Sequence, residues 1–140
     1  MDPRFIATPK ESEIEAALAL WPELAGQRVR PILVTAFGDI FVEQSDGSVL
    51  VVAPMELACR KVASSVDELR EVFDNYDFAS VQLITDLVHL AEERGLVRES
   101  AQVFAAAPHP AFTGQLLVEH LMPMGLRTWH SICVQIKLGA

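Results

Sequence analysis

The sequence predicts a single α+β domain over residues 1–140, built as a twisted, mainly antiparallel sheet flanked by helices. Short apolar runs typical of strands gather in the first half of the chain, whereas apolar residues recur at helical spacing over 9–21, 66–94 and 128–137. Strands and helices in separate blocks indicate an α+β fold. A chain of 140 residues can bury a core of its own without a metal or a disulfide.

The first predicted element is an amphipathic helix over residues 9–21. Thr8 is placed to cap this helix, and Glu11, three residues later, completes a capping box. Pro22 is expected to end it, because the residue before a proline is pushed away from helical backbone angles.

The next segment predicts a β-hairpin and a third strand. Apolar runs over 32–42 and 49–52 flank Asp46-Gly47, which is the strongest short signal for a tight turn. We therefore expect two antiparallel strands joined by this turn. Residues 56–62 predict a third strand, although the same residue types would also suit a helix.

The second half predicts helices followed by shorter elements. Ser65 and Glu68 form a second capping box, which opens a helix that ends near residue 75. A further helix is expected over 79–94, ended by Gly95 in the left-handed conformation. The remaining elements are a strand over 102–106, a loop over 108–110, a strand that begins at Thr113-Gly114 and covers 116–119, and a helix over 128–137.

The charge balance and the beginning of the chain argue against several partners and locations. Eleven basic against 19 acidic side chains give a net charge of −8, the opposite of a surface that binds nucleic-acid phosphates. Residues 1–6 lack the basic start and apolar run of a secretory signal, and no apolar run approaches the roughly 20 residues that span a membrane. Cys59 and Cys133 have no metal-ligand spacing, so we expect free thiols in a cytoplasmic protein.

The sequence contains no motif for catalysis, metal binding or cofactor binding. G-x-S-x-G, H-E-x-x-H, G-x-G-x-x-G and the P-loop are all missing. Cys133 lies on the apolar face of the last helix and is expected to be a small buried hydrophobe, whereas His109, between two prolines, is expected at the surface. We therefore predict a protein without catalytic, metal or cofactor residues. A small hydrolase that uses Cys133 or a histidine is the enzymatic alternative.

One charged stretch, residues 67–77, stands out. Five acidic side chains against the single basic Arg70 give five minus one, a net charge of −4, which is half of the total. Two interpretations stay open: a well-solvated helix with acidic residues at its N-terminus, or a docking surface for a basic protein. The candidate partner-binding residues are Asp67, Glu68, Glu71, Asp74 and Asp77.

A succession of short motifs resembles a bacterial family. The motifs are Phe37-Gly38-Asp39-Ile40-Phe41, the Asp46-Gly47 turn, the helix start at 63–69, the loop from Pro110 to Gly114 and the tail His130-Ser131-Ile132-Cys133-Val134-Gln135-Ile136. Over about residues 15–137 the chain thereby resembles the C-terminal domain of type VI secretion immunity proteins, which is often found behind a GAD-like module. It is more distantly similar to SUKH-type immunity proteins. Thr113 replaces one glycine of the family's loop, and no GAD-like module precedes the matching segment.

The resemblance implies a non-catalytic protein that binds a cognate bacterial toxin, a nuclease in some family members, and blocks it. The resemblance thus implies a toxin protein as the partner, and the acidic stretch, interpreted as a docking surface, adds that this toxin is basic. The charge balance and the short apolar runs indicate that no nucleic acid and no membrane is involved. A homodimer stays open. An accessory or regulatory interaction module unrelated to toxins is the alternative.

The residues themselves indicate that the family motifs stabilise the fold rather than contact a partner. Gly38 would permit a bend or a close backbone approach between strands, Asp39 would accept hydrogen bonds from nearby backbone N–H groups, and Gln135 would satisfy backbone groups at the sheet edge. The motif residues given this structural role are Phe37, Gly38, Asp39, Asp46, Gly47, Gly114, Ser131 and Gln135.

Overall fold

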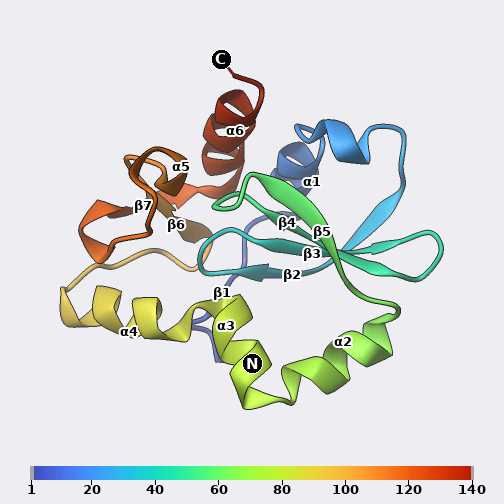
Figure 1. The fold of residues 1–140 in the computed structure, drawn as a ribbon, viewed down its shortest axis with the longest axis horizontal. Helices are drawn as coiled ribbons and strands as arrows, with labels where there is room; N and C mark the ends of the chain where they lie inside the picture. The colour runs from blue at the N-terminus through green and yellow to red at the C-terminus, as the bar shows by residue number, and fades with distance from the viewer. Residues whose placement is uncertain (1, 140) are drawn as a thin grey trace.

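The computed structural model describes residues 2–139, with the backbone alone at positions 76, 78 and 80, and it confirms the α+β class (Figure 1). A five-stranded antiparallel sheet has the order β1-β2-β3-β4-β5, and a two-stranded antiparallel sheet pairs β6 with β7. The strands are β1 (Ile6–Ala7), β2 (Val29–Thr35), β3 (Ile40–Gln44), β4 (Val49–Ala53), β5 (Ala58–Ala63), β6 (Gln102–Ala106) and β7 (Leu121–Gly125). The helices are α1 (Glu11–Leu18), α2 (Val66–Phe73), α3 (Tyr76–Leu83), α4 (Thr85–Glu93), α5 (Pro110–Thr113) and α6 (Leu126–Lys137), with short 3-10 turns η1 (Pro22–Leu24) and η2 (Val118–His120).

The predicted hairpin at Asp46-Gly47 and the third strand are confirmed as β3, β4 and β5. The apolar run over 32–42 is not one strand, because the turn at Phe37-Gly38 divides it into β2 and β3, which pair antiparallel. In the turn between β3 and β4, the Asp46 carboxylate accepts hydrogen bonds from the Ser48 backbone N–H at 2.9 Å and from the Ser48 hydroxyl at 2.6 Å. Gly47 follows Asp46 with a φ of +88°, a backbone conformation that glycine adopts at little cost. Asp46 and Gly47 therefore have the structural role that the sequence predicts.

Both faces of the central strands are buried, because successive side chains of a strand point to opposite sides. Ile40, Val42 and Val52 belong to the main core, which includes side chains of α1, α4 and α6. Phe41 and its neighbours on the other face form a second cluster with α2, in which the rings of Phe41 and Phe73 lie 5.4 Å apart. The sheet thus lies between α6 with α1 on one side and α2 on the other (Figure 1).

Both edges of the five-stranded sheet carry cationic side chains. β1 is only two residues long, and the Arg98 guanidinium donates hydrogen bonds to the backbone oxygens of Pro3 at 3.3 Å, Arg4 at 3.2 Å and Ile6 at 2.6 Å. β5, at the opposite edge, contains Arg60 and Lys61.

The helix predicted over 9–21 is shorter than expected. It begins at Glu11 after Lys10, which makes no side-chain cap, and it ends at Leu18. The capping box at Thr8 is wrong because the backbone N–H of Thr8 instead donates to the Ser100 oxygen at 2.8 Å, which holds this residue beside the segment before β6. A long-range contact thus replaces the local cap.

Two further predictions are corrected. The helix predicted over 79–94 is divided into α3 and α4 by Ile84, whose φ of +51° is incompatible with a continuous right-handed helix. The strand predicted at 116–119 lies instead at Leu121–Gly125, because Gly114, with a φ of +79°, ends the short helix α5 and the 3-10 turn η2 intervenes. The strand over 102–106 is confirmed as β6, and the last helix begins two residues earlier than predicted.

Candidate functional site

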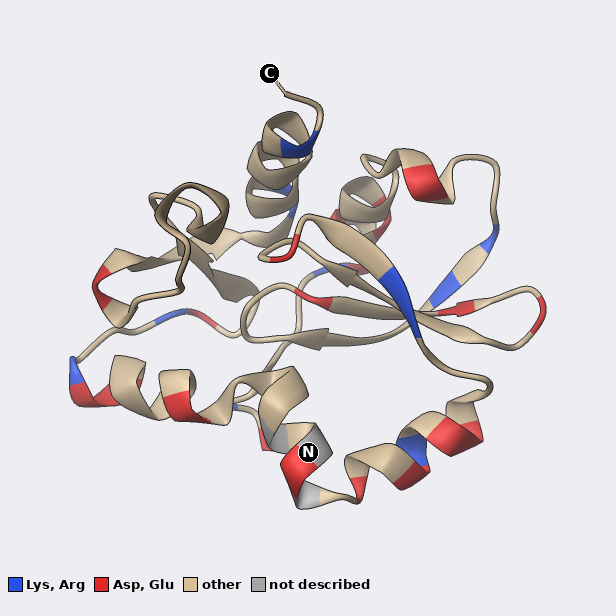
Figure 2. Cartoon of the chain, viewed as in Figure 1, with Lys and Arg blue, Asp and Glu red and all other residues tan. Residues whose placement is uncertain are grey.

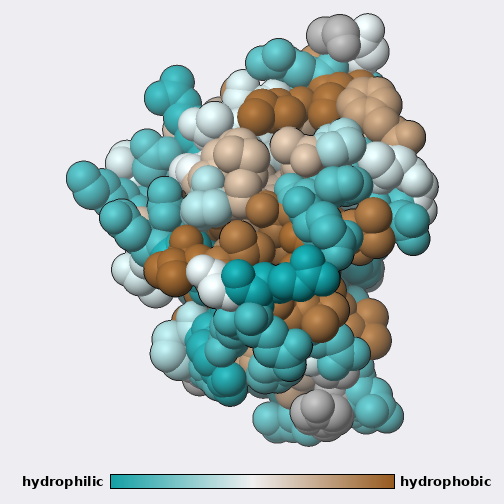
Figure 3. Space-filling model, turned by 90° about the vertical axis from the view of Figure 1, so that its left-hand side faces the viewer, coloured by the Kyte–Doolittle hydropathy of each residue, from teal (hydrophilic) through white to brown (hydrophobic). Residues whose placement is uncertain are grey.

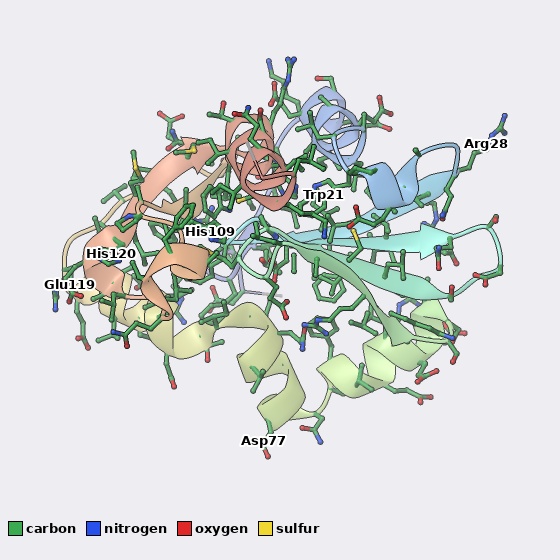
Figure 4. All side chains as sticks on the ribbon, turned by 45° about the horizontal axis from the view of Figure 1, so that its top comes forward. Trp21, Arg28, Asp77, His109, Glu119 and His120 are labelled. Carbon is green, nitrogen blue, oxygen red and sulfur yellow. The ribbon has the colours of Figure 1, made fainter. Side chains whose placement is uncertain are left out.

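The predicted acidic surface spans two helices instead of one (Figure 2). Asp67, Glu68 and Glu71 lie in α2, Asp74 ends this helix, and Asp77 lies in the first turn of α3. All five side chains are exposed, and Figure 4 shows Asp77 pointing away from the rest of the molecule. The structure therefore places these residues along one edge of the molecule, as a docking surface would require.

Glu68 and Asp67 have local roles in α2. The Glu68 backbone N–H donates to the Ser65 hydroxyl at 3.0 Å, and the Glu68 carboxylate accepts from the Ser64 N–H at 3.0 Å, which confirms the second capping box. Asp67 forms an exposed ion pair with Arg70 at 3.6 Å, of a kind that contributes little to stability. Substituting Glu68 would weaken the helix as well as the surface, so Glu71, Asp74 and Asp77 are better suited to a test of partner binding.

Two of the motifs that carry the family resemblance, Phe37-Gly38-Asp39 and the tail that begins at His130, are in contact in the structure. The Trp129 indole N–H donates to the Phe37 backbone oxygen at 3.3 Å, and the His130 Nε2–H donates to the Gly38 oxygen at 2.7 Å. Gly38 has a φ of +88°, and a Cβ atom at this position would lie 2.9 Å from Cδ1 of Trp129. The bend predicted at Gly38 is confirmed between β2 and β3, but the close neighbour there is the Trp129 side chain of the last helix rather than another strand.

His130 joins three separate parts of the chain. Its Nδ1 accepts a hydrogen bond of 2.9 Å from the Trp21 indole N–H, so its proton lies on Nε2, which donates to Gly38. Burial lowers the pKa of His130 to about 4, and the ring is therefore neutral at pH 7. Trp21 belongs to the segment that follows α1, and its hydrogen bond to His130 joins this segment to α6 (Figure 4).

The prediction of a surface position for His109 is wrong. Its ring is only 3% exposed and lies 5.5 Å from that of Trp129. The backbone N–H of Ala111 donates to Nδ1 at 2.9 Å, and Nε2–H donates to the Pro54 oxygen at 2.9 Å. His109 therefore connects the start of α5 to the end of β4. The sequence could not predict this role, because the partner Pro54 is 55 positions away in the chain.

Asp39 also differs from the prediction. Its own backbone N–H donates to the Thr35 hydroxyl at 3.1 Å, so Thr35 rather than the Asp39 carboxylate satisfies this turn. Asp39 is 7% exposed, and its carboxyl group forms no hydrogen bond or close ion pair with the residues that the structure describes. Burial raises the pKa of this carboxyl to about 7. Asp39 is thus a buried acid without a partner among those residues.

The Asp39 carboxyl lies at a small cavity of about 180 Å³ between the β4–β5 turn and the junction of α3 and α4. At its rim the Arg60 guanidinium lies 3.3 Å from the Glu56 carboxylate and 3.2 Å from the Gln82 side-chain oxygen. A buried acid with a strongly shifted pKa beside a cavity is a candidate functional site. The lining residues are Asp39, Met55, Glu56, Arg60, Val81, Gln82 and Ile84. No sequence motif could indicate this site, because three distant segments form it.

Asp39 and His130 are expected to give opposite pH dependences of stability. Between pH 4 and 7 the folded chain holds a proton on Asp39 that the unfolded chain releases, so rising pH lowers the free energy of unfolding. Between pH 4 and 6.5 the unfolded chain protonates His130 and the folded chain does not, so rising pH increases that free energy. The two effects offset each other in the wild type.

Asp39→Asn is therefore expected to make the chain acid-sensitive, because only the effect of His130 remains. The free energy of unfolding should fall by about 2 kcal/mol between pH 6 and pH 4.5 in this variant, and much less in the wild type. Urea unfolding at both pH values measures the difference. Parallel pH profiles of the two proteins would contradict the assignment.

The other predicted motif residues lie away from this cavity. Gly114 ends α5 as described above, whereas Ser131 and Gln135 lie on α6, where the Gln135 side-chain amide donates to the Ser131 hydroxyl at 3.2 Å. The role predicted for Gln135 at the sheet edge is wrong, because its side chain is exposed and its hydrogen bond remains within the helix.

The thiols lie in environments that keep them protonated. Burial raises the pKa of Cys59 to about 12 and also raises that of the buried Cys133. Among the described residues, no three His, Cys, Asp or Glu side chains are grouped as metal ligands. No helix within residues 2–139 has the length and apolar character needed to cross a membrane.

A separate face, on the side of α4 and β7, exposes several apolar side chains (Figure 3). Val97 is 79% exposed and Phe112 72% exposed, while Leu90 of α4 and Met122 of β7 are exposed to a smaller extent. Figure 3 shows polar side chains between the apolar ones on this face. Exposed apolar residues that are separated in this way are normal for a protein surface.

Comparisons with known proteins identify a fold but no family. No family model matches the sequence, and no curated protein gives a significant match. The structure is similar to the crystal structure of Atu4351 from Agrobacterium tumefaciens, with a TM-score of 0.60 and 17% sequence identity. The match covers 93% of this chain and 65% of that chain, so this chain corresponds to less than two thirds of that protein. At this identity the similarity concerns the fold alone.

Proposed function

We propose that this chain is an immunity protein that neutralises a cognate bacterial toxin by direct binding, without catalysis. The observation that carries the proposal is the meeting of Phe37-Gly38 with Trp129-His130 through two buried hydrogen bonds. Two of the motifs on which the resemblance to immunity proteins rests, 92 positions apart in the sequence, are thus joined directly by a hydrogen bond. This contact supports reading these two motifs as parts of one pattern rather than as unrelated short matches.

The acidic segment Asp67–Asp77 supports a basic toxin as the partner. Its helix α2 is held against the sheet by the buried Leu69 and by Phe73, so its exposed side presents charges from a fixed platform. Complementary charges accelerate association and select between partners. A nuclease, whose substrate is polyanionic, is a toxin class with the required basic surface.

Charge reversal tests the docking surface. Glu71→Lys, Asp74→Lys and Asp77→Lys together should reduce the association rate with the toxin encoded beside this chain's gene at least about tenfold, because attraction becomes repulsion. The salt dependence of that rate should weaken or change sign. Surface plasmon resonance with an inactivated toxin at two salt concentrations measures both quantities.

A matched control separates a local contact from the effect of total charge. Glu11→Lys, Glu15→Lys and Glu93→Lys change the net charge equally at exposed positions on α1 and α4. This variant should retain most of the association rate. Equal losses in the two triple variants would remove α2 and α3 as the docking surface, and no binding by the wild type would contradict the proposed function itself.

A further inference from the structure

The cavity at Asp39, here called the Asp39 pocket, is lined by this buried acid, by three apolar side chains and by the polar Glu56, Arg60 and Gln82. Asp39 comes from the turn between β2 and β3, Met55 from the β4–β5 turn, and Val81 and Ile84 from the α3–α4 junction. Val81 is 70% exposed and marks the open side of the cavity, whereas Asp39 is 7% exposed. A ligand that enters the pocket would therefore pass apolar side chains and meet the Asp39 carboxyl group at the base of the pocket, as a negative charge or a hydrogen-bond acceptor.

The lining residues that the structure describes leave this base without a cation of its own. Arg60 is the basic residue that lines the pocket, and its guanidinium is already bound to Glu56 and Gln82 at the rim. With Asp39 ionised, the lining residues carry two negative charges and one positive charge. A ligand that adds one positive charge beside the Asp39 carboxylate would bring the net charge of the pocket to zero.

The shape and chemistry select one class of ligand. A volume of about 180 Å³ lies below the range of cofactor and drug pockets, which starts near 300 Å³, so the pocket suits a single side chain. Lysine and arginine place an aliphatic stem along apolar surface and a cationic head on a carboxylate. Both properties match the walls and the base of the pocket.

We propose that the Asp39 pocket receives one lysine or arginine side chain of the protein partner. This inference rests on the proposed function, because it assigns a specific anchor within a complex with a basic toxin. The pocket opens beside α3, which also carries Asp77 of the acidic surface, so one partner face can contact both. The buried acid fixes the position of the partner, and the exposed acids guide its approach.

Binding should depend on pH, because the ligand's cation requires an ionised carboxylate. With a pKa of about 7, Asp39 is mostly protonated at pH 6 and mostly ionised at pH 8. The other charged groups at the pocket are Glu56 and Arg60, and the described side chains of the α3–α4 junction that line it are the uncharged Val81, Gln82 and Ile84. The affinity for a basic side chain should therefore rise about tenfold from pH 6 to pH 8.

The experiment is an NMR titration of the ¹⁵N-labelled full chain with Nα-acetyl-arginine amide and Nα-acetyl-lysine amide. Nα-acetyl-citrulline amide, which is similar in shape to the arginine probe but uncharged, is the ligand control. We expect saturable shifts of the amides of Asp39, Glu56 and Ile84 at millimolar concentrations of at least one basic probe. The tenfold pH effect should be present, and citrulline should bind at least tenfold more weakly.

Two variants test the assignment to this pocket. Asp39→Asn should abolish the saturable shifts, and Val81→Trp, which keeps the carboxyl but narrows the open side, should reduce the affinity at least tenfold. Glu93→Gln removes an exposed carboxylate of α4, away from the acidic surface, and should leave the affinity for the probes unchanged. If the Asp39→Asn protein does not fold, the affinity of the Val81→Trp variant for the probes decides whether they bind in this pocket.

The proposal is overturned by wild-type shifts that persist in both variants, or by the absence of saturable binding at about 100 mM probe, a concentration well above the millimolar range of weak single-site contacts. These probes need no toxin, so their failure is distinct from a failure of the proposed function. If the probes bind but Asp39→Asn and Val81→Trp bind the toxin with unchanged affinity, the pocket is not the partner's anchor. A loss of at least tenfold in toxin affinity in both variants supports the anchor.

Discussion

Replacing Gly38 with alanine is expected to lower the free energy of unfolding by about 2–5 kcal/mol. A left-handed backbone costs an ordinary residue about 1–2 kcal/mol, and overpacking a buried site adds about 1–3 kcal/mol. The added methyl group would lie 2.9 Å from Trp129, a fully buried ring that cannot move without disturbing its hydrogen bond to Phe37. Urea unfolding followed by tryptophan fluorescence measures the loss.

Gly47→Ala is the matched control, because Gly47 has the same φ of +88° and no atom lies within 4 Å of the position that its new methyl group would take. It should lose only the backbone contribution of about 1–2 kcal/mol. The difference between the two variants therefore isolates the contact with Trp129. Equal losses would show that this contact contributes nothing to stability.

Replacing His130 with leucine is expected to cost about 2–6 kcal/mol, the second large effect. The substitution leaves the Trp21 indole N–H and the Gly38 oxygen buried without partners, at about 1–3 kcal/mol each. Leucine is similar in volume to histidine, so the cost is dominated by the two unsatisfied polar groups. The midpoint and slope of urea unfolding at pH 7 give the change in stability.

His120→Leu provides the corresponding control. The Nδ1 atom of His120 is buried without a hydrogen-bond partner among the described residues. Replacing His120 therefore breaks no hydrogen bond at Nδ1 and leaves no other group there unsatisfied. We expect this variant to lose less than about 1 kcal/mol. A loss at His120 as large as that at His130 would contradict the role of the Trp21–His130–Gly38 hydrogen bonds.

Local signals predicted those elements whose stabilising contacts are also local. The Ser65–Glu68 capping box and the Asp46-Gly47 turn are closed by side chains within four residues, and both are confirmed. The strand over 102–106 has an apolar pattern that its pairing with β7 satisfies. Where a distant segment competes, the local signal fails, as at Thr8, whose N–H binds Ser100.

The candidate site could be predicted only in part for the same reason. The acidic residues are visible as a run in the sequence, and their exposure follows from their charge. The Asp39 pocket depends on the break at Ile84, which turns the α3–α4 junction toward the β4–β5 turn. No residue near position 84 signals this break, since Ile84 is neither glycine nor asparagine.

The edges of the main sheet restrict how another chain can associate with it. Strand addition needs a long row of free backbone groups, but β1 has two residues whose neighbouring oxygens are occupied by Arg98. Arg60 and Lys61 place positive charge on the opposite edge strand, which discourages pairing between copies. These edges discourage fibrous self-assembly, and any protein that binds this chain would contact its side chains rather than extend its sheet.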